Sequence, residues 1–455
     1  MGPRMFDRFQ SDFDLLDQSF DHLFPILRSI TGPGIEKSID YFRQFMPLEV
    51  KKIPTGSEVF DWTIPPEWHC KRARLWAPDG TLLCDTNVNN LSVVNYAEPV
   101  DGTFSLEELE PHLHSLPHLP DAIPYVTSYY KRTWGFCLTH KVRQSLTSGH
   151  YRVLIESEFK DGGVPYATCV LPGDSDKEIM LTSYLCHPSL ANNELSGPLA
   201  LLALYRRIKA WPKRRYSYRF VLNPETIGSL CFLSEYHNHL RKKLVAGLIV
   251  TCIGGGATGI RYKASRRGDS LFDTLATRFT NQQEAGPLPF SYMDFTPTGG
   301  SDERQYCAPG FNLPMGQVAR AAYGFYDGYH NSLDTKEFMG IDNLVESVDA
   351  IEHFLSLGEI AGNPVNHSPF GEPQLGKRNL YPNMNSEKTR SDSNDALSDG
   401  RVSLERLLWI LNMADGRNSL ADIADKCGCS IGELKGIIER LETENLISYH
   451  QKEPV

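Results

Sequence analysis

Six side chains in this sequence are of types that could carry out hydrolysis at a metal centre. They are His187, Asn193, Glu225, Asp302, Glu303 and His330. Neutral imidazole nitrogens and carboxylate oxygens are common ligands of catalytic zinc, which keeps one coordination position open for water. Another carboxylate beside that water can take its proton and pass it to a leaving amine. These residue types together predict amide hydrolysis assisted by a metal ion.

Taken one at a time, each of these residues also has an ordinary structural explanation. Glu225, in the segment NPETIGS, could stabilise the first turn of a helix, where a carboxylate interacts favourably with the helix dipole. Asp302 and Glu303, in GGSDERQY, could do the same, and a histidine in a loop is often only a surface residue. The site hypothesis therefore depends on whether the fold brings these segments together.

The middle of the chain alternates between apolar strands and amphipathic helices. The predicted strands are KEIMLTSYL, YSYRFVLN and VAGLIVTCI. This alternation predicts an α/β fold with a mostly parallel sheet, in which functional residues gather beyond the carboxyl ends of the strands. His187 follows the first of these strands and Glu225 follows the second, so we expect both side chains at the same edge of the sheet.

The flanking regions have other patterns. Residues 13–48 carry apolar positions at helical spacing around a Gly-Pro-Gly break, which predicts two helices. From residue 56 to about 159, short alternating runs separated by Pro, Gly and Asn predict a small all-β unit. A polar stretch near 384–400 is typical of a mobile loop, and three short helical segments after it suggest a winged helix-turn-helix.

The order of the candidate segments resembles that of the M28-type zinc aminopeptidases. In the sequence, CHPSLANNELSG, PETIGS and YHNSLDT follow one another as the metal-site segments of that family do. Three further segments resemble a bacterial group of aminopeptidase-like proteins with DUF4910 and DUF2172 domains. These are PTGSEVFDWTIPPEW, GSDERQYCAPG and GEPQLGKRNLYP, and the resemblance extends across nearly the whole chain.

The resemblance implies a zinc-exopeptidase-like α/β fold made of three parts. An aminopeptidase-like domain with a mostly parallel sheet flanked by helices would cover residues 1–55 and 160–365. A small β-rich domain would be inserted at 56–159. A winged helix-turn-helix would cover 366–455 and include the mobile loop near 384–400.

The resemblance also implies roles for individual residues. His187 matches the first metal histidine, His330 the last one, and Glu225 the general base. Asn193 stands where the family has an aspartate that bridges two metal ions, and Thr226 replaces a second glutamate. An amide oxygen cannot offset the repulsion between two dications. We therefore expect one zinc ion at most, weakly held by His187, Asn193 and His330.

Three more residues could act on the substrate. Tyr329, beside His330, could donate a hydrogen bond to the oxyanion that develops during hydrolysis. Asp302 and Glu303 could hold an ammonium group of the substrate.

Charge and hydropathy narrow the class of protein further. The chain has 46 basic and 56 acidic side chains and a formal net charge of -10, which argues against nucleic acid and anionic membranes as partners. No apolar run approaches the roughly 20 residues of a membrane span, and the N-terminus is too acidic for a secretory signal. We therefore expect a cytoplasmic protein.

Our leading interpretation is a zinc-dependent aminopeptidase-like hydrolase that acts on a small aminoacyl or acylamino substrate. It would be a biosynthetic accessory for a polysaccharide or a secondary metabolite. Two alternatives stay open, a non-catalytic or regulatory binding protein and an enzyme of acyl transfer or cyclisation on the same fold. A protein partner could bind through the C-terminal domain, and formation of a homo-oligomer also stays open.

Overall fold

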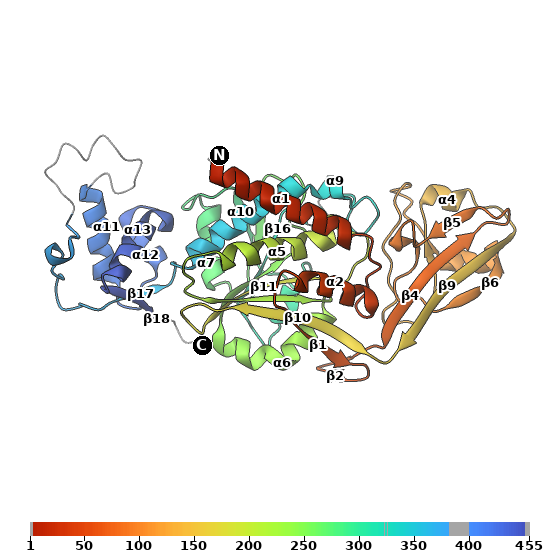
Figure 1. Cartoon of the computed structure of the whole chain (residues 1–455), viewed down its shortest axis with the longest axis horizontal. Helices are drawn as coiled ribbons and strands as arrows, with labels where there is room; N and C mark the ends of the chain where they lie inside the picture. Colours follow the sequence, from red (N-terminus) through yellow and green to blue (C-terminus); the bar gives the residue numbers. More distant parts are fainter. Residues whose placement is uncertain (1–2, 323, 325, 382–399, 451–455) are drawn as a thin grey trace.

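The computed structural model describes residues 3–322, 324, 326–381 and 400–450, which form three parts that lie in a row in Figure 1. The central part is built on a sheet of eight strands in the order β1-β10-β12-β11-β13-β16-β14-β15. Its strands are β1 (Glu49–Pro54), β10 (Gly163–Leu171), β11 (Glu178–Tyr184), β12 (Ser217–Asn223), β13 (Leu244–Val250), β14 (Ile260–Lys263), β15 (Phe290–Met293) and β16 (Met315–Ala319). The pairs β12–β11, β11–β13 and β13–β16 are parallel, which confirms the predicted mostly parallel α/β sheet.

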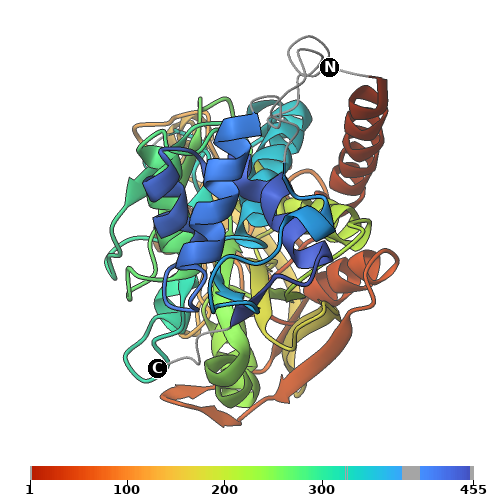
Figure 2. The ribbon, with the colours of Figure 1, turned by 90° about the vertical axis from the view of Figure 1, so that its left-hand side faces the viewer.

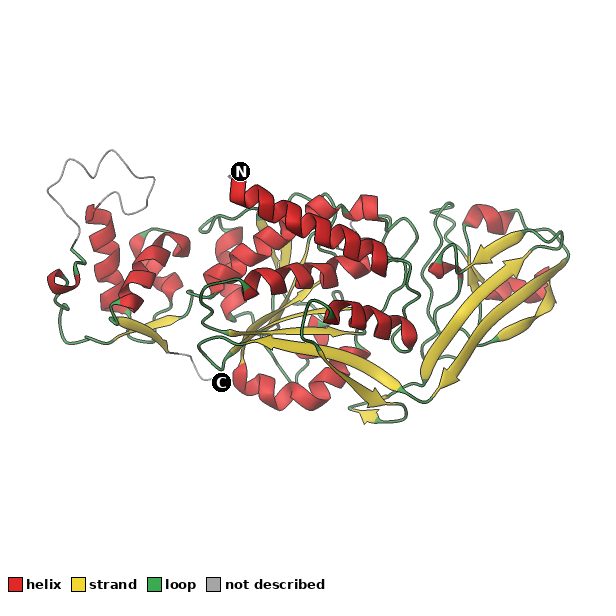
Figure 3. Cartoon of the chain, in the orientation of Figure 1, coloured by secondary structure: helices red, strands yellow, loops and turns green. Residues whose placement is uncertain are grey.

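Helices cover both faces of this sheet (Figure 3). They are α1 (Pro3–Leu23), α2 (Pro33–Arg43), α5 (Ser196–Lys209), α6 (Ile227–Lys243), α7 (Leu271–Thr280) and α10 (Ile341–Gly358). In Figure 1, α1, α5 and α10 lie on one face and α6 lies on the other. Strands β11 and β12 are buried along their whole length, so both of their faces are covered and their burial does not alternate.

The two helices predicted for residues 13–48 are present, but α1 begins earlier, at Pro3. The Gly-Pro-Gly break separates α1 from α2, which starts at Pro33 after Gly32. Gly32 has a φ of 82°, and a Cβ atom there would lie 2.3 Å from the carbonyl oxygen of Trp68. Only glycine fits this close approach, so the break is set by backbone packing as well as by the proline.

A second sheet belongs to the part on the right of Figure 1 and has the order β5-β4-β9-β6. Its strands are β4 (Glu67–Trp76), β5 (Leu82–Asp85), β6 (Val100–Ser105) and β9 (His150–Lys160). Smaller elements complete this part, namely β2 (Glu58–Val59), β3 (Trp62–Thr63), α3 (Leu106–Leu109), β7 (Leu113–His114), β8 (Phe136–Cys137) and α4 (His140–Gln144). The chain leaves the large sheet after β1 and returns in β10, where Pro54 pairs with Gly163. We call this β-rich part the inserted unit.

The C-terminal part consists of three helices and a two-stranded ribbon. They are β17 (Asn363–Asn366), α11 (Gly400–Met413), α12 (Leu420–Cys427), α13 (Ile431–Thr443) and β18 (Ile447–His450), with β17 antiparallel to β18. Ser419 and Ser430 cap the starts of α12 and α13, so both helix boundaries follow from local sequence. The stretch predicted as a mobile loop near 384–400 lies outside the described residues, except for Gly400.

This helical part is packed against the α/β part and lies in front of it in Figure 2. The carboxylate of Glu284, in the loop after α7, accepts hydrogen bonds from the backbone N–H groups of Ile431 at 2.7 Å and Gly432 at 3.3 Å. Arg278 on α7 adds an ion pair to Asp425 at 2.5 Å. The first turn of α13 therefore faces the α/β part.

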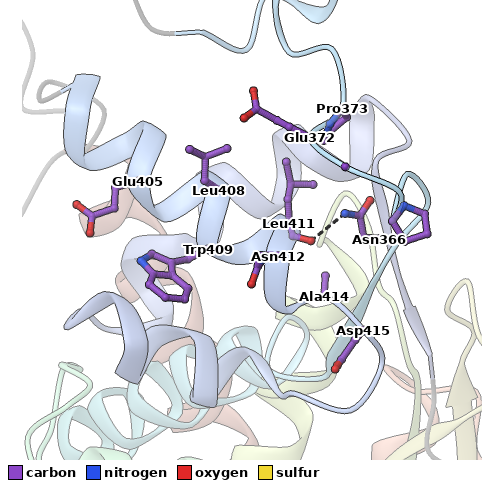
Figure 4. A pocket seen from close by; sticks show the side chains of 12 residues that line it. Asn366, Glu372, Pro373, Glu405, Leu408, Trp409, Leu411, Asn412, Ala414 and Asp415 are labelled. Atoms are coloured by element: carbon purple, nitrogen blue, oxygen red, sulfur yellow. Dashed lines mark hydrogen bonds between the residues drawn. The ribbon is translucent and has the colours of Figure 1, made fainter.

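A groove of about 810 Å³ lies beside α11 (Figure 4). Leu408 and Trp409 supply apolar surface. Three carboxylates, from Glu372, Glu405 and Asp415, lie among the lining residues, and the described part of the lining includes no lysine or arginine. None of the described helices combines the length and the apolar character that a bilayer crossing requires.

Candidate functional site

His187 and Glu225 meet at the carboxyl edge of the large sheet. Strands β11 and β12 are parallel neighbours that end in register, with Tyr184 opposite Asn223. His187 and Glu225 follow these two strand ends directly. Nε2 of His187 therefore comes to 3.8 Å from Oε2 of Glu225. The position of two strand ends in one parallel sheet is sufficient to bring these residues together.

His330 approaches the same place from a distant segment. The centroids of the His330 and His187 rings are 5.4 Å apart, which confirms the expected proximity. The ring of Tyr329 stacks on that of His330 at 4.0 Å and the side chain is only partly buried. An oxyanion-donor role for Tyr329 stays a prediction.

The sequence analysis missed Glu194, which contacts His187 directly. Nδ1 of His187 lies 2.6 Å from Oε2 of Glu194, while Oε1 of Glu194 accepts a hydrogen bond from the backbone N–H of Cys186. Glu194 is held in a π-helical turn, Ala191–Leu195, that leads into α5. Such turns occur frequently at functional sites. The sequence does indicate Glu194 as a candidate site residue, because it is the one carboxylate in the segment ANNELSG.

The pair leaves Nε2 of His187 facing Glu225 and His330. A hydrogen bond from one ring nitrogen to a carboxylate fixes the tautomer and the orientation of a metal-binding histidine, and raises the basicity of the other nitrogen. The contact between His187 and Glu194 has this geometry. His187 is thus held in the orientation that a metal ligand needs, and it would bind an ion after giving up its proton.

Cys186, His187 and Glu194 also form a compact buried group, with one ligand atom of each within 4.8 Å of the others. The His187 atom closest to Glu194 is Nδ1, which the hydrogen bond already occupies. Burial raises the pKa of the Cys186 thiol to about 11, so the sulfur carries a proton at neutral pH. This group is better suited to orienting His187 than to holding an ion by itself.

The two histidines differ in their protonation. Burial disfavours charge on His187, but the neighbouring Cys186 and Glu194 outweigh it and raise the pKa of this imidazole. Burial and the charge of His187 lower the pKa of His330 to about 3. Burial also raises the pKa of Glu225. His330 is therefore neutral in the protein without bound ligand and can offer a lone pair.

Asn193 lies in the same buried region, and the partners of its side chain are uncharged. Its Nδ2 donates to the hydroxyl of Tyr184 at 3.2 Å and to Sγ of Cys252 at 3.8 Å. Its Oδ1 is buried and finds no hydrogen-bond partner among the described residues. A buried amide oxygen of this kind is costly unless a ligand or water satisfies it. The residues present thus fit one ion held by His187, His330 and a neutral oxygen, and they offer too little negative charge for two.

The carboxylates of Asp302 and Glu303 both have partners within the protein. The carboxylate of Glu303 is fully buried, forms an ion pair with Lys263 at 2.7 Å and accepts from the backbone N–H of Ser301. Asp302 is also buried, and its Oδ1 accepts from the backbone N–H of Thr226 at 2.7 Å. Both carboxylates are committed to internal partners, so this arrangement does not support the substrate-ammonium role.

The same segment contributes a different residue to the site. The hydroxyl of Ser301 donates a hydrogen bond to Oε1 of Glu225 at 2.7 Å. The buried pairs of Asp302 and Glu303 fix the backbone around Ser301. The role of GGSDERQY is therefore to orient Glu225, which residue types alone did not indicate.

Four residues around the site have a left-handed backbone conformation. Ser189, Thr226, Cys252 and His330 all have positive φ angles, between 48° and 63°, although none is glycine. Left-handed conformations at such residues persist only where surrounding contacts impose them, and they often mark functional sites. Three of them, Ser189, Thr226 and Cys252, lie just beyond the ends of β11, β12 and β13.

The fold and the site define the class of this protein: it is an aminopeptidase-like α/β protein with a C-terminal winged helix. The chain belongs to the family described as a domain of unknown function, DUF4910, whose model matches residues 18–360. A winged helix-turn-helix model matches residues 363–449.

Relatives of the whole chain come from Clostridium acetobutylicum. One is named as a candidate polysaccharide biosynthesis protein with an aminopeptidase-like domain, and is 40% identical over 428 residues that cover 94% of each chain. A crystal structure of a candidate peptidase is 36% identical, with a TM-score of 0.83 over 98% of this chain and 99% of that one.

More distant solved structures share only the fold. A peptidase M28 precursor from Shewanella amazonensis is 13% identical and has a TM-score of 0.54, over 78% of this chain and 94% of that one. A zinc aminopeptidase from Bacillus subtilis is 12% identical and has a TM-score of 0.53, over 76% of this chain and 94% of that one. These likenesses confirm the aminopeptidase-like fold.

Proposed function

We propose that this protein is a zinc-dependent amide hydrolase that acts on a small aminoacyl or acylamino substrate. One observation carries the proposal. Nε2 of His187, with Nδ1 held by Glu194, lies beside both Glu225 and His330 at the carboxyl edge of the sheet. This arrangement combines two potential zinc ligands with a partly exposed carboxylate that can move a proton.

Each residue then has a defined task. His187 and His330 would hold the ion, with the buried amide oxygen of Asn193 as a neutral third donor. Zinc in such a site supplies a Lewis acid that polarises a carbonyl and makes water more acidic. Glu225, oriented by Ser301, would take the proton from water and deliver it to the leaving amine. The raised pKa of Glu225 favours this exchange, because a more basic carboxylate takes a proton from water more readily.

The biological setting belongs to the proposal as well. The relative named for polysaccharide biosynthesis covers 94% of this chain, and this supports a role as a biosynthetic accessory. In such a role the protein would remove an acyl or aminoacyl group from a precursor.

A second candidate is a binding protein on the same fold. Three uncharged side chains at the site favour a binding protein, because they leave little negative charge to retain a cation. They are Asn193, Thr226 and Cys252, whose thiol is protonated. Such a protein would use the strand-end site to hold a ligand without turnover.

Metal analysis and turnover of one set of preparations would separate the two. We expect about one zinc per chain in protein purified without chelators, and hydrolysis of members of a panel of aminoacyl and acylamino compounds. Glu225→Gln should lower turnover by about 10² while leaving zinc content and unfolding temperature unchanged. Glu107→Gln is the matched control, because Glu107 is an exposed first-turn carboxylate of α3.

Two outcomes would contradict the hydrolase. Protein that retains no zinc and hydrolyses no compound of the panel supports the binding protein instead. A Glu225→Gln variant that is less stable but equally active shows that Glu225 only stabilises the helix that follows it.

A further inference from the structure

The inserted unit reaches into the candidate site through one segment, residues 122–129. Pro124 and Asn331 form an antiparallel bridge between this segment and the loop that carries His330. The backbone N–H of Tyr125 donates to the carbonyl oxygen of His330 at 2.8 Å. The backbone N–H of Ser332 donates to the carbonyl oxygen of Ile123 at 2.9 Å. The backbone N–H of Ile123 donates in turn to the hydroxyl of Ser332, also at 2.9 Å. The His330 loop is thus tied directly to the inserted unit.

The side chain of Tyr125 contacts both histidines. Its ring centroid is 4.9 Å from that of His187 and 5.5 Å from that of His330, and it meets the latter edge to face. Its hydroxyl is 2.6 Å from the hydroxyl of Tyr129, on the same segment. The ring therefore packs on the imidazoles while the hydroxyl is satisfied within the inserted unit.

We propose that Tyr125 is a positioning residue of the site, which makes the inserted unit part of the functional centre. It acts by fixing His330 relative to His187. The consequence for zinc and for turnover rests on the proposed function, whereas the positioning itself does not.

The backbone of His330 explains why an external support is needed. His330 has a φ of 57°, a conformation that a non-glycine residue holds only where its surroundings impose it. Within its own loop, the side chain of Asn331 bonds the carbonyl oxygens of Asp327 and Tyr329. The bond to the carbonyl oxygen of His330 itself comes from Tyr125 of the inserted unit.

The ring of Tyr125 limits the side chain of His330 in the same way. An aromatic ring in edge-to-face contact with an imidazole restricts the rotamers that the imidazole can adopt. Without the ring, only the stacking on Tyr329 would restrain the imidazole of His330 against turning away from His187. The ring, and not the hydroxyl, is therefore the part that positions His330.

Three variants test this assignment. Tyr125→Ala removes the ring, Tyr125→Phe keeps it, and Tyr130→Ala is the control. Tyr130 directly follows this segment and is 61% exposed, and its ring packs on that of Trp62 at 5.4 Å. Hydrogen exchange of the amides of Tyr125 and Ser332, zinc affinity, and separate values of kcat and KM should be measured for each.

We expect Tyr125→Ala to speed exchange at these amides and to weaken zinc binding about 10- to 100-fold, as losses of residues that orient metal ligands do. It should lower kcat more than it changes KM, because a misplaced ligand affects the reaction more than substrate binding. Tyr125→Phe should have the exchange rates, zinc affinity and kcat of the unaltered protein. Tyr130→Ala should leave the same quantities unchanged.

The assignment is overturned if Tyr125→Ala exchanges these amides at the original rate and keeps its zinc affinity. It is also overturned if Tyr125→Phe is as defective as Tyr125→Ala, because the hydroxyl would then be the active part. If the unaltered protein binds no zinc and hydrolyses nothing, the proposed function fails. The exchange rates still decide whether Tyr125 positions His330.

Discussion

Nδ1 of His187 and Oε2 of Glu194 lie 2.6 Å apart, and both side chains are almost completely enclosed. A buried contact of this kind between an imidazole and a carboxylate is a charge-assisted hydrogen bond, which is stronger than a neutral one. It leaves only Nε2 of His187 available to a ligand. The predictions below begin with this pair.

Replacement of Glu194 by Gln should weaken zinc binding by about 10- to 100-fold. The carboxylate uses one oxygen for Nδ1 of His187 and the other for the backbone N–H of Cys186, whereas an amide has a single oxygen for these two donors. Competition with a chelator measures the affinity. Glu346→Gln is a suitable control, because it removes an exposed carboxylate paired with Arg320 at 3.0 Å. Equal losses in both variants would contradict an orienting role for Glu194.

Asn193→Asp should raise zinc affinity, and hydrolysis with it. The change places an anionic oxygen where Oδ1 is buried and finds no hydrogen-bond partner among the described residues. A carboxylate is a stronger donor to a dication than an amide. Titration of the metal-free variant with zinc checks this, and equal or weaker binding would mean that Asn193 does not face the ion.

Asp334 should make stability depend on pH in a defined direction. Burial raises its pKa to about 7, although its two oxygens accept from the backbone N–H groups of Asn192 and Asn193 at 2.8 Å. The usual value of an aspartate in the unfolded chain is about 3.9. The folded protein therefore binds this proton more tightly, and the stabilisation is complete below pH about 4 and is lost as the pH rises to about 7.

The contribution of Asp334 can be isolated by comparison with Asp334→Asn. The free energy of unfolding of the unaltered protein, relative to that of the variant, should fall between pH 4 and pH 7 and be constant above pH 8. Denaturant titrations across this range measure it. Parallel stability curves would show that Asp334 has an ordinary pKa.

The full-length protein should not bind duplex DNA. In helix-turn-helix proteins the second helix enters the major groove with its N-terminal residues, but the first turn of α13 is bound by Glu284. Residues 400–455 also carry seven Lys and Arg against nine Asp and Glu. Fluorescence anisotropy at micromolar protein should show no association, and binding that weakens steeply with salt would refute this expectation.

Much of the fold and part of the site follow from the sequence. The apolar runs that became β11 and β12 are buried strands because helices cover both faces of the sheet. Their parallel pairing alone places His187 beside Glu225. His330 could be placed only by resemblance to a family, since no local pattern relates it to a strand end.

The remaining parts of the site depend on tertiary contacts that no local pattern encodes. Tyr125 belongs to a segment of the inserted unit that has no periodicity, and its contacts with His187 and His330 appear only when two parts of the chain meet. The substrate-ammonium role of Asp302 and Glu303 stays a prediction, and the residue types do not reveal that both carboxylates are bound within the protein. Their internal partners, Thr226 and Lys263, come from separate elements.

The pairing of β1 with β10 has a consequence for how the chain folds. Pro54 and Gly163 are neighbours in the sheet although the whole inserted unit separates them in sequence, and closing so long a loop in an unstructured chain is entropically unfavourable. Strands β4 and β9 pair immediately beyond them, with Glu67 opposite Lys160. Once β4 and β9 have paired, the open loop between β1 and β10 shrinks to residues 55–66 and 161–162. We therefore expect the inserted unit to fold first and β1 to join the large sheet late, so that destabilising β4 would slow refolding of the entire α/β part.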